Sequence, residues 1–455
     1  MDTNSFIQMI KNLIKKFIPK NLILFYHKIL AILASFFYGY PSQKLIVVGV
    51  TGTSGKSTVI YLMSKILEKS GFKVGVTSTI FFKIDQEEKI NDKKMTMLGR
   101  FALQKLIKKM VKAGCQYALI ETTSEGIRQF RHLGINYDIV LFTNLYPEHI
   151  ESHGSFKKYK EEKLKLFAKL KNEKSKIING KKIKKIIIAN LDNEHSFDFL
   201  AHWAEEKYGF TLGDLKLNLN EIEKIKIVKA EDIEIKSDGS KFKINNVDFK
   251  INLLGQHNVY NALAAITFGL SQGLSLEKMA EILKSIKNIP GRIEFIDQGQ
   301  PFKIIVDYAF EPKAITALYE IVKMIPHQKV IHVFGSAGGG RDKWRRPILG
   351  EIAAKNCDYI ILTNEDPYDE DPYQILSQIK SGISRTQFPT SHLFEILDRR
   401  QAIKKAIQLA EANDLILITG KGCEQAIVVK NNKKIPWDDR EVVKEELKKI
   451  STTKN

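Results

Sequence analysis

The chain is poor in cysteine, and the few cysteines that it has are isolated. Cys115, Cys357 and Cys423 lie far apart among 455 residues. An odd number of widely spaced thiols provides neither a disulfide framework nor the paired ligands of a structural zinc site. These absences exclude the small disulfide-rich class and favour a protein of the reducing cytoplasm.

Acidic residues are outnumbered. Lys and Arg total 71 against 52 Asp and Glu, which gives a formal net charge of +19. This charge suits a polyanionic partner, but much of it is lysine scattered through a Lys- and Ile-rich sequence, and no nucleic-acid-reading module is present. We therefore expect a solvated basic surface and no nucleic-acid partner.

Long apolar runs are missing as well. Residues 22–37 are apolar on nearly all sides, but the stretch is short for a membrane span and carries His27 and Lys28. Before it, residues 6–17 place apolar side chains at helical spacing and lysines elsewhere, as in a basic amphipathic helix. Residues 4–37 therefore have two interpretations, an anchor on a membrane surface or a helical pair packed on the next domain.

One glycine-rich stretch is present and organises the chain. Residues 49–58, GVTGTSGKST, follow the apolar run 45–48 and precede a helical pattern. Backbone N–H groups and the positive helix end converge in such a loop and make an anion site. The expected ligand is a nucleotide, with Lys56 on its phosphates and the hydroxyl of Ser57 or Thr58 on Mg²⁺. The other predicted loop ligands are Gly52, Thr53, Ser54 and Gly55.

The expected fold class is α/β. Strands and helices alternate from 45 to 288, which predicts a central P-loop ATPase domain with a mostly parallel sheet. Pro290-Gly291 breaks both helix and strand and indicates a hinge into a C-terminal Rossmann-like α/β domain. The predicted divisions are a helical N-terminal segment at 1–44, the central domain at 45–288, the C-terminal domain at 289–440 and a charged tail at 441–455.

Polar residues follow two of the predicted strands. Glu121 comes directly after the apolar run 117–120, and His149 follows the run 139–142. The carboxyl ends of parallel strands meet at the edge where such sheets bind ligands. Carboxylate and imidazole can hold a divalent cation there, which makes a Mg-ATP site credible.

These stretches resemble the Mur ligase family, which joins amino acids to peptidoglycan precursors. The matches run in the family's order from about residue 45 to 430, and they are most similar to the MurE branch, which adds the third residue of the peptide. The resemblance implies an ATP-dependent carboxylate–amine ligase that works through an acyl phosphate. Besides the phosphate loop, the matching stretches are 121–124, 143–154, 255–265, 290–294, 307–309, 341–347 and 420–424.

The resemblance also implies roles for single residues. By it, Glu121 and His149 bind Mg²⁺, and Lys163 matches a lysine that CO₂ carbamylates so that it helps to hold a second Mg²⁺. With Lys56 these residues form the expected catalytic set. The implied ATP ligands are Asn261, Arg292 and Asp307. The implied substrate ligands are Thr123, Ser124, Arg131, Arg341, Glu365, Asp366, Tyr368, Gly420 and Glu424.

The loop 363–372 bears on the incoming amino acid. Family members that use diaminopimelate carry Asp-Asn-Pro-Arg here, whereas this chain has Glu365, Asp366, Pro367 and Tyr368. The loop is acidic and lacks the arginine that would clasp a second carboxylate, which favours a cationic side chain such as that of lysine. Three further departures stand where the family has histidine: Glu125, Phe310 and Cys423.

The N-terminus leaves the acceptor open. Only the helical segment precedes Gly49, where ligases of this family have a UDP-binding domain. The expected acceptor is UDP-MurNAc-L-Ala-D-Glu in the cytoplasm. A shortened, amidating relative would instead act on a lipid-linked muropeptide at the inner face of the membrane. Folate polyglutamylation is a further ligase reaction to consider. A membrane-tethered nucleotide-binding scaffold belongs to another class, and the intact Lys56 and Lys163 argue against it.

Overall fold

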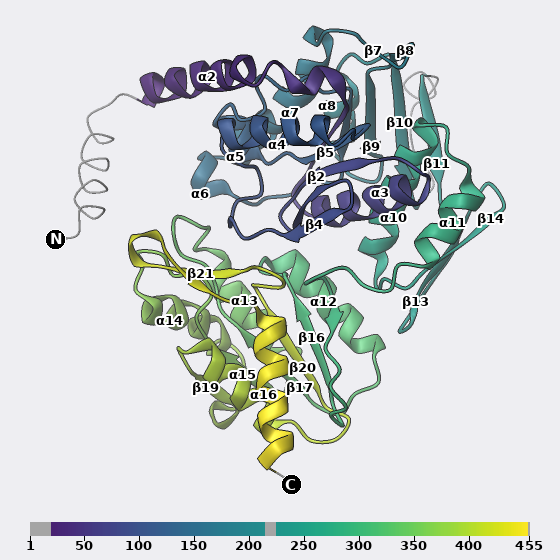
Figure 1. Ribbon diagram of the computed structural model, residues 1–455. Helices are drawn as coiled ribbons and strands as arrows, with labels where there is room; N and C mark the ends of the chain where they lie inside the picture. The colour runs from purple at the N-terminus through teal and green to yellow at the C-terminus, as the bar shows by residue number, and fades with distance from the viewer. Residues whose placement is uncertain (1–19, 214–223, 454–455) are drawn as a thin grey trace.

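The protein consists of two α/β domains, one above the other in the view of Figure 1. The computed structural model describes residues 20–213 and 224–453. The expected amphipathic helix at 6–17 lies outside these residues. The first described element is helix α2 (Lys20–Phe37), which lies on the outer side of the upper, central domain.

The central domain is built on a nine-stranded sheet. Seven neighbouring strands are parallel, and a hairpin of two antiparallel strands extends one edge. The central strands are runs of Val, Ile and Leu whose side chains are buried on both faces of the sheet. A parallel sheet that lies between two layers of helices requires this pattern. In sheet order the strands are β11 (Ile225–Lys229), β10 (Glu206–Thr211), β9 (Ile186–Asn190), β6 (Ile139–Phe142), β1 (Ile46–Thr51), β5 (Tyr117–Glu121), β2 (Val74–Thr77), β3 (Phe81–Ile84) and β4 (Glu87–Ile90).

Helices cover both faces of this sheet and form two apolar cores. One core joins the sheet to α3 (Lys56–Lys69), α10 (Gln256–Ser271) and α11 (Leu276–Lys284). The other joins it to α4 (Arg100–Lys112), α7 (Phe156–Lys169) and α8 (Ser196–Leu200). Shorter elements near the sheet are η1 (Pro41–Lys44), α5 (Ser124–Arg128), α6 (Ile150–His153), η2 (Leu170–Asn172), and the hairpin of β7 (Lys176–Ile178) and β8 (Lys181–Ile183).

A small antiparallel sheet lies beside the central domain. It contains β12 (Glu231–Lys236), β13 (Gly239–Ile244) and β14 (Val247–Ile251). Phe242 and Phe249 stack across two of its strands, and both belong to the core around α10 and α11. The small sheet is therefore fixed to the central domain by its apolar face.

The C-terminal domain has its own six-stranded sheet, parallel except for its first strand. In sheet order the strands are β15 (Glu294–Phe295), β16 (Lys303–Asp307), β20 (Leu415–Thr419), β17 (Val330–Phe334), β18 (Tyr359–Leu362) and β19 (Leu393–Glu395). Two apolar clusters fill its faces, one beneath α12 (Pro312–Met324), α13 (Arg345–Ala354) and α14 (Pro372–Ile383), the other beneath α15 (Arg399–Leu409) and α16 (Asp439–Thr453).

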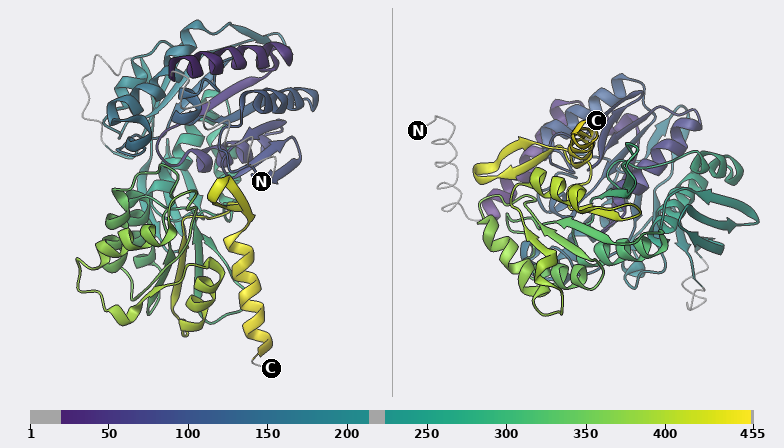
Figure 2. Two further views of the ribbon diagram at one scale, coloured as in Figure 1. Left: turned by 90° about the vertical axis from the view of Figure 1, so that its left-hand side faces the viewer. Right: turned by 90° about the horizontal axis from the view of Figure 1, so that it is seen from below.

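The last helix belongs to the C-terminal domain. Val442, Val443 and Leu447 of α16 are buried in the core that α15 shares with the sheet, although the sequence predicted a charged tail from 441. Figure 2 shows α16 running along the lower domain, from the end nearer the central domain toward the C-terminus. The remaining elements are η3 (Thr390–His392), η4 (Lys430–Asn432) and the hairpin of β21 (Ala426–Val429) and β22 (Lys433–Pro436).

Candidate active site

A cavity of about 890 Å³ separates the two domains, and both line it. Strands β1 and β5 pair so that Val50 lies opposite Glu121, while β1 and β6 bring Thr51 beside Phe142. The loops after these three strands therefore meet at one sheet edge, where parallel α/β sheets bind ligands.

The phosphate loop requires glycine at two positions. Gly52 and Gly55 have φ values of +151° and +80°, in the region that favours glycine. A Cβ atom at Gly52 would lie 1.9 Å from Thr143 Oγ1, and one at Gly55 would lie 2.4 Å from Asn261 Oδ1. The backbone N–H of Ser54 donates to Asn144 Oδ1 at 3.0 Å, so the loop after β6 holds this loop in shape.

Lys56 begins helix α3 and folds back over its own loop. Its Nζ donates to the carbonyl oxygens of Gly52 and Thr53 at 3.1 and 2.9 Å. Burial lowers its pKa, while the carboxylates of Glu121 and Glu311 act in the opposite direction. The ammonium thus lies among backbone acceptors, at the N-terminus of a 14-residue helix.

Two predicted Mg²⁺ ligands are already in contact. Ser57 Oγ donates to Glu121 Oε2 at 2.8 Å, and the same carboxylate accepts the backbone N–H of Thr79 at 2.7 Å. A hydroxyl and a carboxylate are the hard oxygen donors that Mg²⁺ prefers. Among the residues that the structure describes, no three His, Cys, Asp or Glu side chains are grouped to hold a metal by themselves.

Lys163 and His149 lie on the other side of the phosphate loop. Lys163, buried on α7, donates from Nζ to Gly52 O at 2.6 Å. Burial, and then repulsion from Lys56, hold its pKa well below the usual value. His149, with φ of +58°, also has a pKa well below its usual value, because it is buried and faces Arg341 and Lys163. A neutral imidazole can ligate a metal.

The predicted nucleotide ligands lie at the domain boundary. Asn261 donates to Asn258 Oδ1 at 3.0 Å, and the Arg292 guanidinium lies 4.3 Å from the Tyr308 ring centroid. The Asp307 carboxylate is already engaged by the protein backbone. Its two oxygens accept the N–H groups of Ile293 and Ala309 at 2.7 and 2.6 Å. Burial raises the pKa of Asp307. Its contacts make it a residue that fixes the hinge backbone.

A buried acidic pair beside this site was not predicted. The Glu148 carboxylate accepts a hydrogen bond from Arg345 at 2.9 Å, and Glu311 accepts one from Tyr146 at 3.0 Å. Burial, and then the Glu311 carboxylate, raise the pKa of Glu148 to about 8. Glu311 Oε2 has no hydrogen-bond partner within the described parts of the chain. Phe310 replaces the family's histidine, and the Arg345 guanidinium lies 5.1 Å from its ring centroid.

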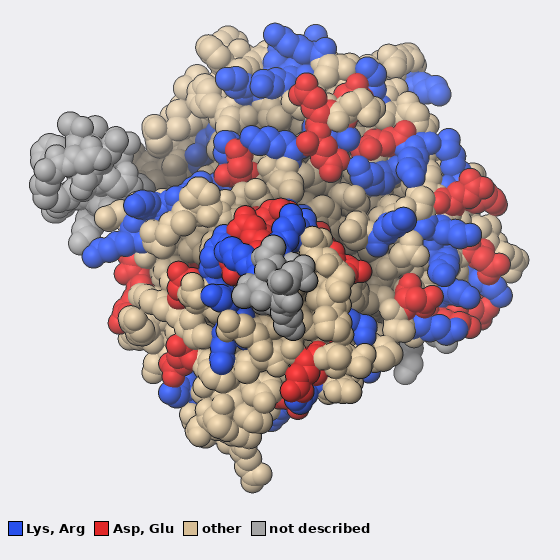
Figure 3. Space-filling model, turned by 60° about the horizontal axis from the view of Figure 1, so that its bottom comes forward, with Lys and Arg blue, Asp and Glu red and all other residues tan. Residues whose placement is uncertain are grey.

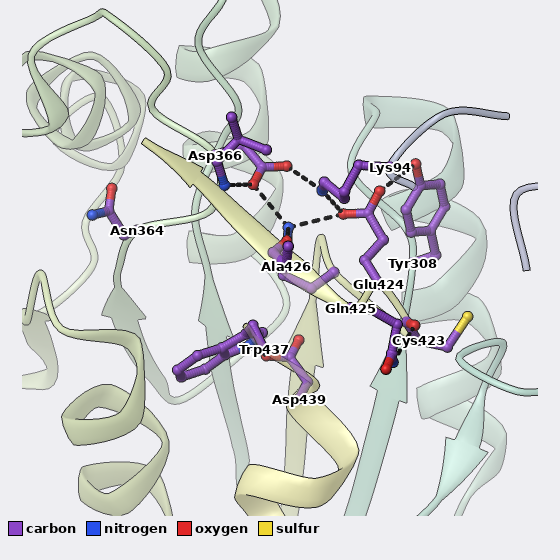
Figure 4. A network of polar contacts seen from close by, with 12 residues as sticks. Lys94, Tyr308, Asn364, Asp366, Cys423, Glu424, Gln425, Ala426, Trp437 and Asp439 are labelled. Atoms are coloured by element: carbon purple, nitrogen blue, oxygen red, sulfur yellow. Dashed lines mark hydrogen bonds and ion pairs between the residues drawn. The ribbon is translucent and has the colours of Figure 1, made fainter. Parts of the chain in front are cut away.

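The candidate amino-acid pocket contains a cluster of four charges, and Figure 4 labels three of them, Lys94, Asp366 and Glu424. Lys421 Nζ contacts Asp366 Oδ1 and Glu424 Oε2, each at 2.9 Å. Lys94, from the central domain, reaches the same two carboxylates and lies 2.6 Å from Asp366 Oδ2. No sequence signal indicated Lys94, because it belongs to a loop after β4, far from both acids in the chain.

The other predicted substrate residues line the same cavity. Glu365 Oε2 is buried and unpaired within residues 20–213 and 224–453, and a Cβ atom at Gly420 would lie 2.7 Å from it. Arg341 lines the cavity, while the neighbouring Asp342 accepts the backbone N–H of Glu151 at 2.9 Å across the domains. Tyr368, which the resemblance matched to an arginine position, lies next to Gly339.

On the expected acceptor side, Thr123 and Ser124 also make local contacts. Thr123 Oγ1 accepts the Gly126 N–H at 3.1 Å and caps α5, and Ser124 Oγ lies 3.2 Å from His153 Nε2. Arg131 donates to Gln129 Oε1 at 2.6 Å and to the Met97 carbonyl. These three predicted residues therefore line the cavity in one group.

Charges on one face of the surface are mixed. Figure 3 shows one face of the molecule, on which Lys and Arg lie among Asp and Glu and form no broad field of one sign. The opposed charges gathered in the cavity are thus a local arrangement. They do not follow from the net charge of the chain.

Comparisons with known proteins match both domains to one protein family. The family profile "Mur ligase middle domain" matches residues 50–269, and "Mur ligase, glutamate ligase domain" matches residues 291–422. A UDP-N-acetylmuramyl-tripeptide synthetase of Roseiflexus sp. is 36% identical over 419 residues, which are 90% of this chain and 80% of that protein. A UDP-N-acetylmuramoyl-L-alanyl-D-glutamate–2,6-diaminopimelate ligase of Caldanaerobacter subterraneus is 35% identical over 422 residues, 92% of this chain and 81% of its own.

A solved structure is also similar. It is a UDP-N-acetylmuramoyl-L-alanyl-D-glutamate–2,6-diaminopimelate ligase, 26% identical, with a TM-score of 0.57 over 90% of this chain and 79% of that chain. The similarity extends through both domains. It supports the arrangement of a phosphate-loop domain and a second α/β domain around one cavity.

Proposed function

Since the chain belongs to the Mur ligase family of ATP-dependent amide-bond ligases, we propose that it joins a free diamino acid to the muramyl dipeptide UDP-MurNAc-L-Ala-D-Glu. One observation carries the proposal. A phosphate loop with Lys56, Ser57 and Glu121 lines one side of a single cavity, and the carboxylates of Asp366 and Glu424 line the other.

The reaction divides between the domains. The acceptor carboxylate attacks the γ-phosphorus of ATP, ADP leaves, and the acyl phosphate is then attacked by the amine. The resulting tetrahedral intermediate collapses to an amide and phosphate. Lys56 is placed to neutralise charge on the transferred phosphoryl group, because its ammonium lies at the loop and helix end that bind phosphates. Ser57, Glu121, His149 and a carbamylated Lys163 would hold two Mg²⁺ ions, which supply further charge neutralisation there.

The surroundings of Lys163 support its carbamylation. An amine adds to the carbon of CO₂ only in its neutral form, with loss of a proton, and burial favours that form here. The carbamate would place an anion beside the Lys56 ammonium. This change adds an oxygen ligand where the described side chains alone do not assemble a metal site.

The pocket contacts support a cationic amino-acid side chain, with lysine preferred to diaminopimelate. Asp366 and Glu424 already bind the ammonium groups of Lys94 and Lys421. We interpret Lys94 as occupying the position of the side-chain ammonium of the incoming amino acid. Tyr368 supplies no positive charge for a distal carboxylate, and Arg341 would bind the α-carboxylate.

A lipid-linked muropeptide is the second candidate acceptor, favoured by the exposed apolar side chains of α2.

The test is phosphate release by the full chain with ATP, Mg²⁺ and UDP-MurNAc-L-Ala-D-Glu, scanned over lysine, ornithine, diaminopimelate and ammonia. We expect release that requires lysine and is abolished in Lys56→Ala. Activity with diaminopimelate alone would refute the lysine preference, and activity only with a lipid-linked acceptor would refute the soluble one.

A further inference from the structure

Helix α2 carries a stripe of large apolar side chains that face away from the protein. Leu22, Phe25, Ile29, Ile32 and Phe36 each expose between 40% and 67% of their surface. Their spacing of three and four residues places most of them along one side of the helix. Contiguous exposed apolar surface of this kind marks an interaction site in a soluble domain.

The packing of the opposite side fixes the direction of this stripe. Ala31 and Ala34 are buried, and Ser35 Oγ donates to Gly134 O at 2.9 Å. A Cβ atom at Gly134 would lie 2.6 Å from Ser35 Cβ, so the helix backbone lies close to the central domain. At its C-terminal end, Phe37 contacts the Phe101 ring of α4. The helix therefore cannot rotate its apolar stripe inward without losing these contacts with the central domain.

The surroundings of the stripe are basic. Neither α2 nor α4, against which α2 packs, contains a single Asp or Glu. Lys28 on α2 and Lys105, Lys109 and Lys112 on α4 are exposed. An apolar face bordered by lysine is the pattern of a helix that lies in the interface of an anionic membrane.

We infer that the outer face of α2, with the lysines of α4, docks the enzyme on the surface of an anionic lipid bilayer. The apolar stripe enters the acyl boundary, and the lysines remain among the headgroups. No helix within the described residues is long and apolar enough to cross a membrane, so this is attachment to one surface. A second copy of the chain would instead bring two acid-free basic faces together, and like charges oppose that contact.

The docking surface adjoins the acceptor side of the cavity. Arg100, the first residue of α4, donates to the carbonyl of Gln129, whose side chain accepts from Arg131. Figures 1 and 2 show α2 and α4 on the same outer side of the central domain, away from the C-terminal domain. An enzyme held by this face keeps the lower domain free to move relative to the membrane.

The test is co-sedimentation of the full chain with vesicles of phosphatidylcholine, with and without phosphatidylglycerol. We expect binding to the anionic vesicles that weakens as salt is added. The variant Phe25→Ser/Ile29→Ser/Phe36→Ser should bind at least about tenfold more weakly, because it removes the apolar face. These side chains lie at the surface, outside the cavity, so phosphate release and thermal stability should stay close to those of the wild type.

Two variants that each remove three lysines distinguish the effect of the basic face on α4 from the effect of the net charge of the chain. Lys105→Ala/Lys109→Ala/Lys112→Ala should lose about fivefold in binding for each charge removed. Lys278→Ala/Lys284→Ala/Lys404→Ala removes as many exposed charges from α11 and α15 and should bind like the wild type. Three results would overturn the inference: no binding to either vesicle, an unaffected serine variant, or a wild-type dimer that the serine variant converts to a monomer.

Discussion

Replacement of Lys94 by methionine tests how the pocket selects its amino acid. Methionine keeps the apolar stem of lysine and removes the ammonium that contacts Asp366 and Glu424. The side chains of this cluster are nearly buried, with Lys94 and Asp366 exposed by 6% and 7%. Their contacts are therefore not weakened by solvent in the way that surface ion pairs are.

The size of the effect follows from what an incoming lysine must displace. A hydrogen bond to a charged group contributes about 1.5–3 kcal/mol, which corresponds to at least about tenfold in affinity. If the substrate ammonium takes the place of Lys94, removal of this internal competitor should lower KM for lysine by about that factor. The kcat should change little, because Lys94 does not lie at the phosphate loop.

The assay is phosphate release against lysine concentration at saturating ATP and acceptor, together with calorimetric titration of lysine and norleucine without acceptor. Norleucine has the shape of lysine without the ammonium and should gain nothing from the substitution. Lys93→Met is the matched control, because Lys93 is exposed and pairs with Asp92. An unchanged or raised KM for lysine in Lys94→Met would show that Lys94 is a structural clamp only. The calorimetric titration still measures the affinity for lysine if the variant has no turnover.

Three other predictions concern the phosphate side of the cavity. Lys163→Ala should reduce phosphate release at least about tenfold, and added acetate should restore part of it, since a carboxylate replaces the carbamate; a fully active variant would refute the carbamate. Gly55→Ala should abolish ATP binding in a filter assay while the fold persists, because the new Cβ would lie 2.4 Å from Asn261 Oδ1 at a φ of +80°. Glu148 has a folded-state pKa raised to about 8, so the folded protein retains a proton that the unfolded chain loses, and stability should fall as pH rises from about 5 to about 8. Thermal melts of Glu148→Gln should show a smaller fall over that range, and an identical fall would contradict this assignment.

Local sequence was sufficient for the fold class and for the phosphate side of the cavity. The phosphate loop is one continuous stretch between a strand and a helix, so its contacts follow from short-range spacing. Glu121 was predictable because the carboxyl ends of neighbouring parallel strands meet, and it lies 2.8 Å from Ser57 Oγ. Both inferences rest on geometry that adjacent elements share in every parallel sheet.

The remaining site residues depend on how the domains pack together. Lys94 and Asp366 are 272 positions apart in the chain, and Glu148 meets Arg345 across 197 positions. Asp366 was predicted from the resemblance of its loop, but nothing in the local sequence marks Lys94 or the pairing of Glu148 with Arg345, because single charged residues are usually solvated. The low pKa of Lys163 is likewise invisible in a helix rich in lysine, since it arises from burial beside Gly52.

Three contacts that join the domains near the cavity are polar and exchangeable, although Leu254 also enters the apolar core of the C-terminal domain. Asp342 accepts the Glu151 N–H, Lys434 donates to the Lys93 carbonyl at 2.8 Å, and Lys94 contacts Asp366. Water or substrate can replace each of these partners, whereas an apolar seam would resist opening. On the proposed function, Lys94 and the ammonium of a bound amino acid would exclude each other, because Lys94 contacts Asp366 and Glu424 from the other domain. An incoming cationic amino acid would then displace Lys94 from Asp366 and supply a replacement ammonium at that carboxylate.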